Sequence, residues 1–236
     1  MTGHGRGSHP TPFWSYHMTL MIRRLIAASV MGLSASLAQA QDGLQLLGDF
    51  IRSVQSGRAQ FSQTVTAPSK DGQTPRAKTS NGTFEFARPN RFRFNYAKPF
   101  QQTLVADGQT LWLHDVDLNQ VTARPLAQVL QGTPAAVIAA ATDLRGLQAD
   151  FKLSAQPASE GLQWVLAEPR TPGGQVQSIK VGLRAAAKGT ELVSLDMLDS
   201  FGQRSVMRFA QFEANPALPA GSFEFKPPVG ADVLRP

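Results

Sequence analysis

The sequence predicts a mostly β protein with a few helices, arranged as a strongly curved antiparallel sheet or partial barrel. From residue 61 onward, apolar side chains alternate with polar ones in short runs, which is the period of half-buried strands. The 20 glycines and 16 prolines are frequent enough to supply turns between these runs, as in a sandwich or barrel. The runs do not alternate with long helical segments, as a parallel sheet would require. The predicted class is therefore antiparallel β.

One amphipathic helix is predicted to open the domain. Across 42–55, leucine, isoleucine and valine recur at three- and four-residue spacing. We expect Asp42 to cap the N-terminus of this helix and Gly57 to close its C-terminus. Two shorter helical segments are predicted at 126–130 and 134–141, and we expect the helices to lie against the concave face of the sheet.

The strands are predicted from the period-two runs. They cover residues 61–65, 83–87, 91–97, 102–106, 110–114, 151–155, 162–167, 176–183, 191–198, 205–212 and 222–225. Asp107 and Gly108 join two of them as a tight hairpin. The segment 68–82 is predicted to be a loop or an exposed hairpin.

The first forty residues are predicted to be processed rather than folded. Residues 1–20 lack periodicity and indicate an over-called or disordered extension, which leaves the start codon open between Met1, Met18 and Met21. Residues 21–40 carry paired arginines, an apolar run and an Ala-Gln-Ala cleavage site, the layout of a secretory signal peptide. The apolar run is shorter than the roughly 20 residues that span a bilayer. Residues 41–236 are then a single domain, expected in the periplasm.

Charge and cysteine content exclude several classes of protein. Removing residues 1–40 takes away three arginines and no acid, so the formal net charge falls from +6 to +3. We expect no nucleic-acid partner, because no recognition motif accompanies this mild excess. The chain has no cysteine, which excludes thiol nucleophiles and zinc fingers. Gln41 follows the cleavage site, where a lipid-anchored bacterial protein would carry cysteine.

No catalytic or metal-binding pattern stands out. His114 is the one histidine after the signal peptide, and no serine lies in a Gly-x-Ser-x-Gly elbow. Asp115 and Asp117 flank a strand end and could bind a cation, but a solvated turn is the stronger interpretation. We therefore expect no enzyme, no metal and no cofactor.

An aromatic face is the most distinctive pattern. Alternation places Phe84, Phe86 and Arg88 on one face of a strand. It places Phe92, Phe94 and Tyr96 on one face of the next. Such a face is either ordinary core or the lining of a ligand cavity. Arg88 favours the cavity, because a guanidinium at an apolar rim must be exposed or hydrogen-bonded, and carbonyls at a helix C-terminus would serve it.

These residues belong to a set of motifs that resembles the LolA family of periplasmic outer-membrane lipoprotein carriers. The motifs are RPNRFRFNY at 88–96, LVADGQTLWLH at 104–114, LDSFGQ at 198–203, FEFKPPVG at 223–230 and AQFSQ at 59–63. The resemblance implies an incompletely closed antiparallel β-barrel covered by a helical lid. The sequence departs from the family pattern at Phe94, where the family carries tryptophan, and in the length of the 68–82 loop.

The resemblance also implies a function and its residues. Family members take acylated lipoproteins from an inner-membrane ABC transporter and pass them to LolB, the outer-membrane receptor. Arg88 matches the family arginine that latches the lid, and Phe92 matches the position that favours forward transfer. The implied lipid-binding cavity is lined by Phe84, Phe86, Phe92, Phe94, Tyr96 and Trp112. A monomer is expected.

Three other functions stay open from the sequence. A periplasmic binder of another lipid or amphiphile would use the same cavity. A LolB-like anchored receptor is opposed by the missing cysteine. A hydrolase would have to depend on His114.

Overall fold

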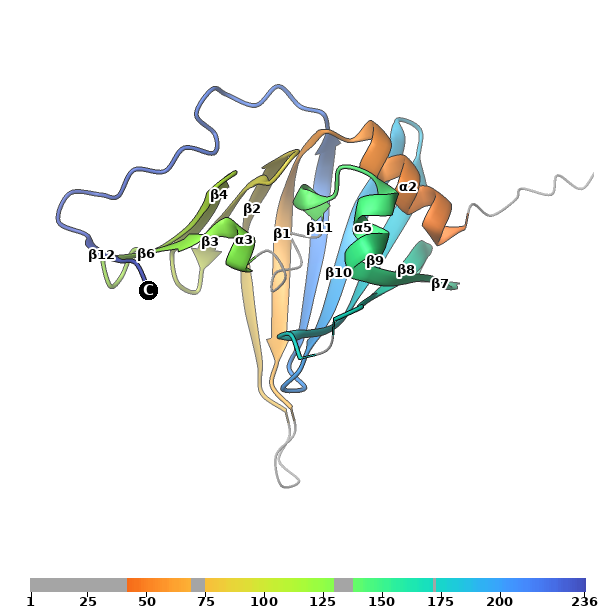
Figure 1. The fold of residues 1–236 in the computed structure, drawn as a ribbon, viewed down its shortest axis with the longest axis horizontal. Coiled ribbons are helices and arrows are strands. Elements are labelled where there is room, and N and C mark those ends of the chain that lie inside the picture. Colours follow the sequence, from red (N-terminus) through yellow and green to blue (C-terminus); the bar gives the residue numbers. More distant parts are fainter. Residues whose placement is uncertain (1–41, 69–74, 130–137, 172) are drawn as a thin grey trace, which may run out of the picture. The chain divides into compact units, whose positions relative to one another are not determined.

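The computed structural model describes residues 42–68, 75–129, 138–171 and 173–236. In these residues twelve strands form one sheet, in the order β12-β6-β5-β4-β3-β2-β1-β11-β10-β9-β8-β7. Neighbouring strands pair antiparallel, except that β12 runs parallel to β6. The sheet curls, and its outermost strands β12 and β7 lie apart (Figure 1). The mostly β class and the incompletely closed sheet are confirmed.

The element bounds follow the predicted periodicity closely. The strands are β1 (Ser56–Thr66), β2 (Ala77–Ala87), β3 (Arg91–Lys98), β4 (Gln102–Asp107), β5 (Thr110–Asp115), β6 (Gln120–Pro125), β7 (Phe151–Ser159), β8 (Leu162–Pro169), β9 (Val176–Ala186), β10 (Gly189–Asp199), β11 (Arg204–Ala214) and β12 (Asp232–Leu234). The described part of the chain also forms the helices α2 (Gly43–Ser53), α3 (Leu126–Val129) and α5 (Leu144–Asp150), and residues 138–140 are helical. Among the described residues, no helix has the length and hydrophobicity of a membrane span.

The first helix has the predicted N-cap and a different end. Asp42 accepts a hydrogen bond from the Leu44 amide at 3.2 Å, as a capping carboxylate should. The helix ends at Ser53, and the prediction that Gly57 closes it was wrong. Gly57 lies in β1, where a Cβ would come within 3.1 Å of the Phe86 ring. The glycine is needed because an aromatic ring packs on the backbone there.

The predicted strands are confirmed except the last. Residues 222–225 form turns, because the amides of Ser222 and Glu224 bond back to Pro219 and Gly221. Strands β6 and β12 and helix α5 were not predicted. Of the two alternatives for 68–82, the hairpin is correct for residues 77–82, which extend β2 against β1. Residues 69–74 lie outside the described residues, as do residues 134–137 of the predicted helix 134–141, and residues 138–140 of that helix are confirmed.

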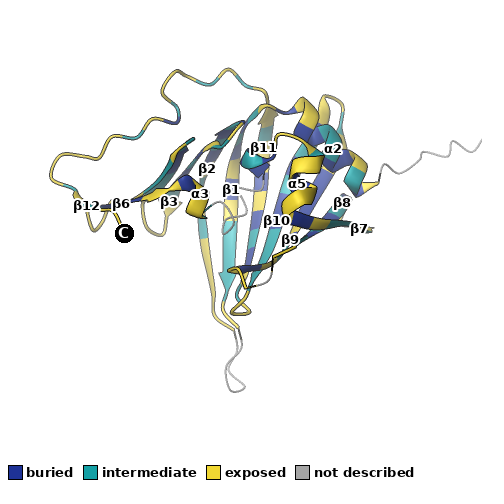
Figure 2. Cartoon of the chain, in the orientation of Figure 1, coloured by how far each residue is buried: buried dark blue, intermediate teal, exposed yellow. Residues whose placement is uncertain are grey.

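The concave face of the sheet holds the core. Helix α2 packs against β7, β8, β9 and β10, and α5 packs against β7 and α2. Figure 1 shows both helices inside the curl of the sheet, and Figure 2 shows that burial is deepest beneath them. Buried residues are concentrated in the first half of β1 and the second half of β2. Burial decreases toward the hairpin that joins the two strands. The core therefore occupies one end of the concave face.

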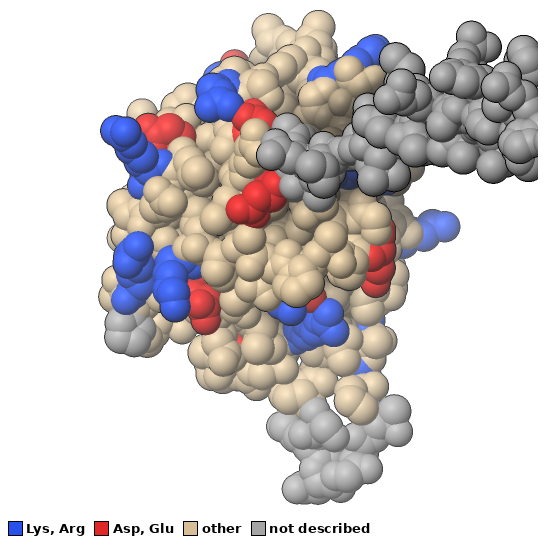
Figure 3. All heavy atoms as spheres, turned by 90° about the vertical axis from the view of Figure 1, so that its right-hand side faces the viewer, with Lys and Arg blue, Asp and Glu red and all other residues tan. Residues whose placement is uncertain are grey.

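The outer surface carries paired charges. Arg184 and Glu191 form an ion pair at 2.8 Å, and Arg204 and Asp196 form one at 2.6 Å. On the face shown in Figure 3, basic and acidic side chains are interspersed. The small excess of basic residues is therefore not gathered into one basic stripe on this face.

The C-terminal segment crosses the convex face of the sheet. The Arg93 Nε donates to the Ser222 carbonyl at 2.6 Å, and its Nη2 donates to the Glu224 carbonyl at 2.9 Å. Arg91 lies over the Phe223 ring at 5.8 Å. These contacts hold the segment against β3.

We expect Arg93→Met to loosen this segment, because two charge-assisted hydrogen bonds disappear. The free energy of unfolding should fall by about 1–2 kcal/mol, and amide hydrogen exchange should accelerate at residues 216–226. Arg184→Met is the control, since its exposed ion pair is worth about 0.5 kcal/mol or less. Unchanged exchange in Arg93→Met would contradict the assignment.

Candidate functional site

Four phenylalanines form an apolar floor on the concave face. The register of β2 and β3 sets Phe84 opposite Phe94 and Phe86 opposite Phe92. Each is exposed by 2% or less. The rings of Phe84 and Phe94 stack with centroids 4.4 Å apart, a separation at which aromatic pairs attract. Alternation along two neighbouring strands therefore brings together the predicted aromatic residues.

Two further aromatic rings extend this floor, and the sequence analysis did not select them. Phe61 of β1 lies 5.3 Å from the Phe94 ring, and Phe209 of β11 lies 5.4 Å from the Phe84 ring. Both were placed in predicted strands. Phe61 reaches the floor because β1 pairs directly with β2. Phe209 reaches it because β11 pairs with β1, which joins residues far apart in the chain, and no local pattern could have signalled that pairing.

Trp112 does not belong to this face. Leu113 pairs with Leu104, and Leu104 pairs with Phe94, so these side chains share the concave side. Trp112 alternates to the convex side, where its ring lies 5.5 Å from the Phe225 ring. Its Nε1 donates to Asp107 at 2.9 Å. The inclusion of Trp112 in the cavity was wrong, because a shift of one residue in a strand reverses the face.

Arg88 joins two separate segments at one end of the floor. Its Nε donates to the Val54 carbonyl, at the C-cap of α2, at 2.9 Å. Its Nη1 donates to the carbonyls of Ile138 and Ala141. One side chain on the sheet therefore satisfies backbone groups of both covering segments.

The guanidinium is 7% exposed and lies among aromatic rings. It is 5.7 Å from the Phe50 centroid and 5.5 Å from the Phe86 centroid, within the range of cation–π attraction. Burial lowers the pKa of Arg88 to about 10, so it stays charged at neutral pH. Its Nη2 has no hydrogen-bond partner among the described residues.

Among the described residues, little space is left between the helices and the sheet beside Arg88. The internal cavity beside Arg88 measures about 10 Å³, near the lower limit for one water molecule. It is lined by Leu47, Phe50, Ile51, Arg88, Ile138, Leu147, Ala167 and Val181. An acyl chain cannot enter this space unless the covering segments move.

Polar side chains border the floor on the side away from Arg88. The Tyr96 hydroxyl donates to the Gln63 Oε1 at 3.0 Å, and the Gln63 Nε2 donates to the Ser205 Oγ at 2.8 Å. Burial raises the pKa of Tyr96 to about 12, so the phenol remains protonated at neutral pH. Tyr96 thus ends the row of rings with a hydroxyl group.

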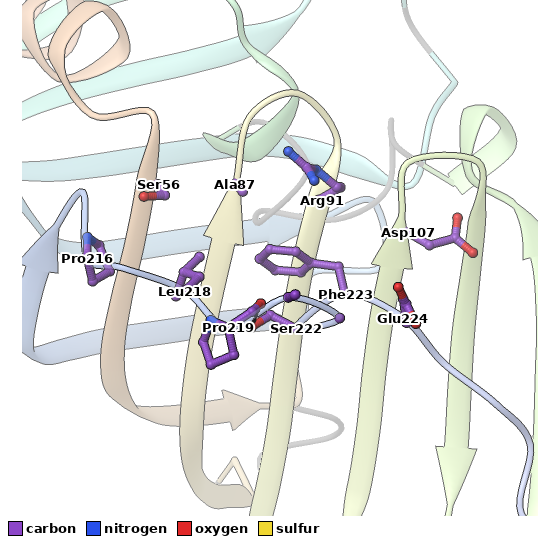
Figure 4. Close-up of a pocket in the computed structure, with 12 residues that line it drawn as sticks. Ser56, Ala87, Arg91, Asp107, Pro216, Leu218, Pro219, Ser222, Phe223 and Glu224 are labelled. Carbon is purple, nitrogen blue, oxygen red and sulfur yellow. Dashed lines mark hydrogen bonds between the residues drawn. The ribbon is translucent and has the colours of Figure 1, made fainter.

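A larger pocket lies on the convex side, under the C-terminal segment (Figure 4). Its volume is about 490 Å³, and Arg91, Asp107, Phe223 and Glu224 are among its lining residues. Because Arg91 and Phe92 alternate across β3, this pocket and the aromatic floor lie on opposite faces of the sheet.

His114, Asp115 and Asp117 were the remaining candidates for catalysis or cation binding. His114 lies 6.0 Å from the Phe225 ring. Asp115 accepts hydrogen bonds from Gln102 and from the Leu118 amide, which close a turn and lower the pKa of its carboxyl. Asp117 is exposed. Within the described part of the chain, no group of three His, Cys, Asp or Glu residues is arranged to hold a metal.

The buried phenol of Tyr96 predicts an unusual alkaline titration. In a chain beginning at Gln41, Tyr96 is the one tyrosine, so its ultraviolet absorbance reports a single group. The midpoint should lie at about 12 rather than near 10. Its contribution to stability is present below pH 10 and is lost as the pH rises through 12. A midpoint near 10 in the folded protein would contradict the buried position.

Comparisons with known proteins bear on these features. Residues 52–226 match the family described as "Outer membrane lipoprotein carrier protein LolA". An outer-membrane lipoprotein carrier protein from Albidiferax ferrireducens is 63% identical over 201 residues, which cover 85% of this chain and 94% of that one. One from Methylibium petroleiphilum is 50% identical over 214 residues, covering 91% and 99%.

The solved structures that match do so at low identity. A LolA superfamily protein from Nitrosomonas europaea is 14% identical, with a TM-score of 0.44, and covers 76% of this chain and 95% of that one. The family assignment therefore depends on sequence, where the match covers most of the chain, including the aromatic strands and Arg88. The chain belongs to the LolA family of outer-membrane lipoprotein carrier proteins.

Proposed function

We propose that this chain is a periplasmic carrier that binds the acyl chains of lipoproteins released from the inner membrane and delivers them to an outer-membrane receptor. The observation that carries the proposal is Arg88, which ties two covering segments over an aromatic floor. The proposal is also supported by relatives named outer-membrane lipoprotein carrier protein, whose matches cover most of the chain.

Acyl chains need such a carrier because water opposes their passage. Exposing each buried methylene costs about 0.8 kcal/mol, so several long chains cost tens of kcal/mol. The floor of Phe84, Phe86, Phe92 and Phe94 offers a matching apolar surface once the covering segments move. Binding alone does not suit a carrier, however, because very tight binding would prevent delivery.

The Arg88 latch limits the affinity. Opening the lid breaks its hydrogen bonds to carbonyls, each worth roughly 1.5–3 kcal/mol when the donor is charged. That free energy offsets part of the gain from burying acyl chains, so the loaded carrier stays able to release its cargo. The proposal assigns binding and release to this chain and no catalytic step.

The cellular setting forms part of the proposal. We infer that residues 21–40 are a cleaved signal peptide that directs residues 41–236 to the periplasm as a monomer. The partners would be acylated lipoproteins, the inner-membrane ABC transporter that releases them and the receptor LolB. Relatives named for lipoprotein transport support this setting.

We expect Arg88→Leu to retain cargo. Without the charged donor the closed lid loses its latch, so acylated lipoprotein should bind about tenfold or more tightly. Transfer to the receptor should fall correspondingly. The measurement is release from, and delivery by, the loaded carrier, with circular dichroism to confirm the fold.

Arg91→Leu is the matched control, because Arg91 is three residues away and its side chain lies on the convex face over Phe223. Delivery should be normal in this variant. Normal delivery by folded Arg88→Leu would overturn the role of Arg88 as a latch.

A carrier of another amphiphile would use the same floor, and ligand mass separates the two. Native mass spectrometry of the protein purified from the periplasm should detect a lipoprotein bound to the chain. In cells depleted of their own carrier, the chain should restore growth. If the purified protein carries only a small lipid and the chain does not restore growth, the carrier of another amphiphile is favoured.

A further inference from the structure

Polar side chains follow the phenylalanines on part of the concave face. Along each strand, away from the Arg88 end, the positions on this face are Phe92, Phe94 and Tyr96 in β3; Phe86, Phe84, Gly82 and Ser80 in β2; Ala59, Phe61, Gln63 and Val65 in β1; and Phe209, Met207 and Ser205 in β11. The polar positions are staggered across the strands, because Gln63 pairs with Ser80 and with Met207, whereas Ser205 pairs with Val65.

Three of these polar side chains form a connected row. Tyr96, Gln63 and Ser205 are joined by hydrogen bonds of 3.0 and 2.8 Å that cross β3, β2, β1 and β11. Tyr96 and Gln63 are half-buried, so a ligand entering the concave face could reach them. Ser205 is 5% exposed and lies at the deep end of the row. We name this set the polar row.

The polar row has unused hydrogen-bonding capacity. The Gln63 amide carries two N–H donors, and one of them bonds Ser205. The Ser205 oxygen accepts that bond, and among the described residues its own hydrogen has no acceptor, so it can rotate toward one. The row therefore offers donors beside an apolar floor. A carbonyl oxygen attached to a long hydrocarbon chain fits this arrangement.

The length of the floor also fits an acyl chain. From Gln63 back to Gly57, which packs beneath Phe86, β1 rises by about 20 Å at about 3.3 Å per residue. An extended palmitoyl chain has a similar length. A carbonyl at the polar row would thus place the methyl end of the chain near Arg88.

We propose that Gln63 and Ser205 donate hydrogen bonds to the ester or amide carbonyls of bound acyl groups, with Tyr96 orienting the Gln63 amide, so that the polar row is a head-group subsite and the hydrocarbon tails run along the phenylalanine floor toward Arg88. This subsite rests on the proposed carrier function and names the position and orientation of its ligand. It sets the depth of insertion, since a carbonyl drawn past the row would lose its hydrogen bonds inside an apolar site.

The test compares two synthetic lipopeptides that differ at the carbonyls. One carries a dipalmitoylglyceryl group on an N-terminal cysteine, and the other carries the dialkyl ether analogue, which lacks both ester carbonyls. The protein is the chain from Gln41, and affinities are measured by competition against a fluorescent fatty acid. The unmodified chain should bind the ester about three- to tenfold more tightly than the ether.

Gln63→Leu should abolish this preference and bind the two lipopeptides equally. Tyr96→Phe, which removes one oxygen atom and preserves the ring, should reduce the preference for the ester. It replaces Gln63→Leu as the test variant if Gln63→Leu does not fold. Thr64→Val is the matched control. Thr64 makes one cross-strand hydrogen bond, to Thr79 at 3.2 Å, from the adjacent position on the opposite face. It should retain the full preference.

The outcomes separate the two proposals. If the unmodified chain binds both lipopeptides with no ester preference, or if Gln63→Leu and Tyr96→Phe keep it in full, the head-group subsite is overturned and the carrier function stands. If the folded, unmodified chain binds neither lipopeptide, the carrier function itself fails. Loss of preference in Gln63→Leu but not in Thr64→Val supports the subsite, because a purely structural role would weaken binding of both lipids alike.

Discussion

The buried charge of Arg88 constrains the rest of this structure. A guanidinium that is 7% exposed must find acceptors, because an unpaired buried charge is very costly. The carbonyls available on an aromatic face are those that the covering segments bring to it, at Val54, Ile138 and Ala141. The arginine therefore dictates where α2 ends and where residues 138–141 lie. Besides these bonds, α2 is held to the sheet by apolar packing, in which Phe50 lies 6.3 Å from Phe86.

The alternation of side chains distributes functions between the two faces of one sheet. The concave face of β3 carries Phe92, Phe94 and Tyr96, whereas the convex face carries Arg91 and Arg93. Arg93 holds the C-terminal segment outside while the phenylalanines form the floor inside. The coverings of the two faces also meet, because the Asn215 side chain, at the start of the C-terminal segment, accepts from the Gln55 and Ser56 amides and donates to the Ser53 carbonyl at the end of α2.

Local sequence predicted the parts of the fold that depend on local chemistry. The aromatic face of β2 and β3 could be read because alternation is a property of each strand alone. Trp112 was misplaced because its strand has apolar residues on both faces, Leu111 and Leu113 inside and Trp112 outside. In such a strand alternation does not identify the inner face.

Contacts between distant segments account for some of the missed features and not for others. Strand β6 alternates polar residues with the buried Val121 and Ala123 and pairs with its neighbour in sequence, β5, so local sequence carried this signal. Phe209 joins the floor only through the pairing of β11 with β1. Residues 222–225 have a strand-like pattern, yet Arg93 takes up carbonyls of this segment instead of a neighbouring strand. For Phe209 and for residues 222–225, a partner remote in sequence decided the outcome.

The nearly filled interior explains how transfer could proceed without a large free-energy change. Phe84 and Phe94 stack at 4.4 Å, and Phe50 lies 6.3 Å from Phe86, so the rings and the cover bury one another in the closed form. When an acyl chain enters, the phenylalanine rings exchange their contacts with α2 for contacts with methylene groups. Little apolar surface then faces water in either the closed or the loaded form. The net affinity is then a difference between two similar burial terms plus the cost of releasing Arg88. Such a balance makes binding sensitive to single hydrogen bonds, at the latch and at the polar row alike.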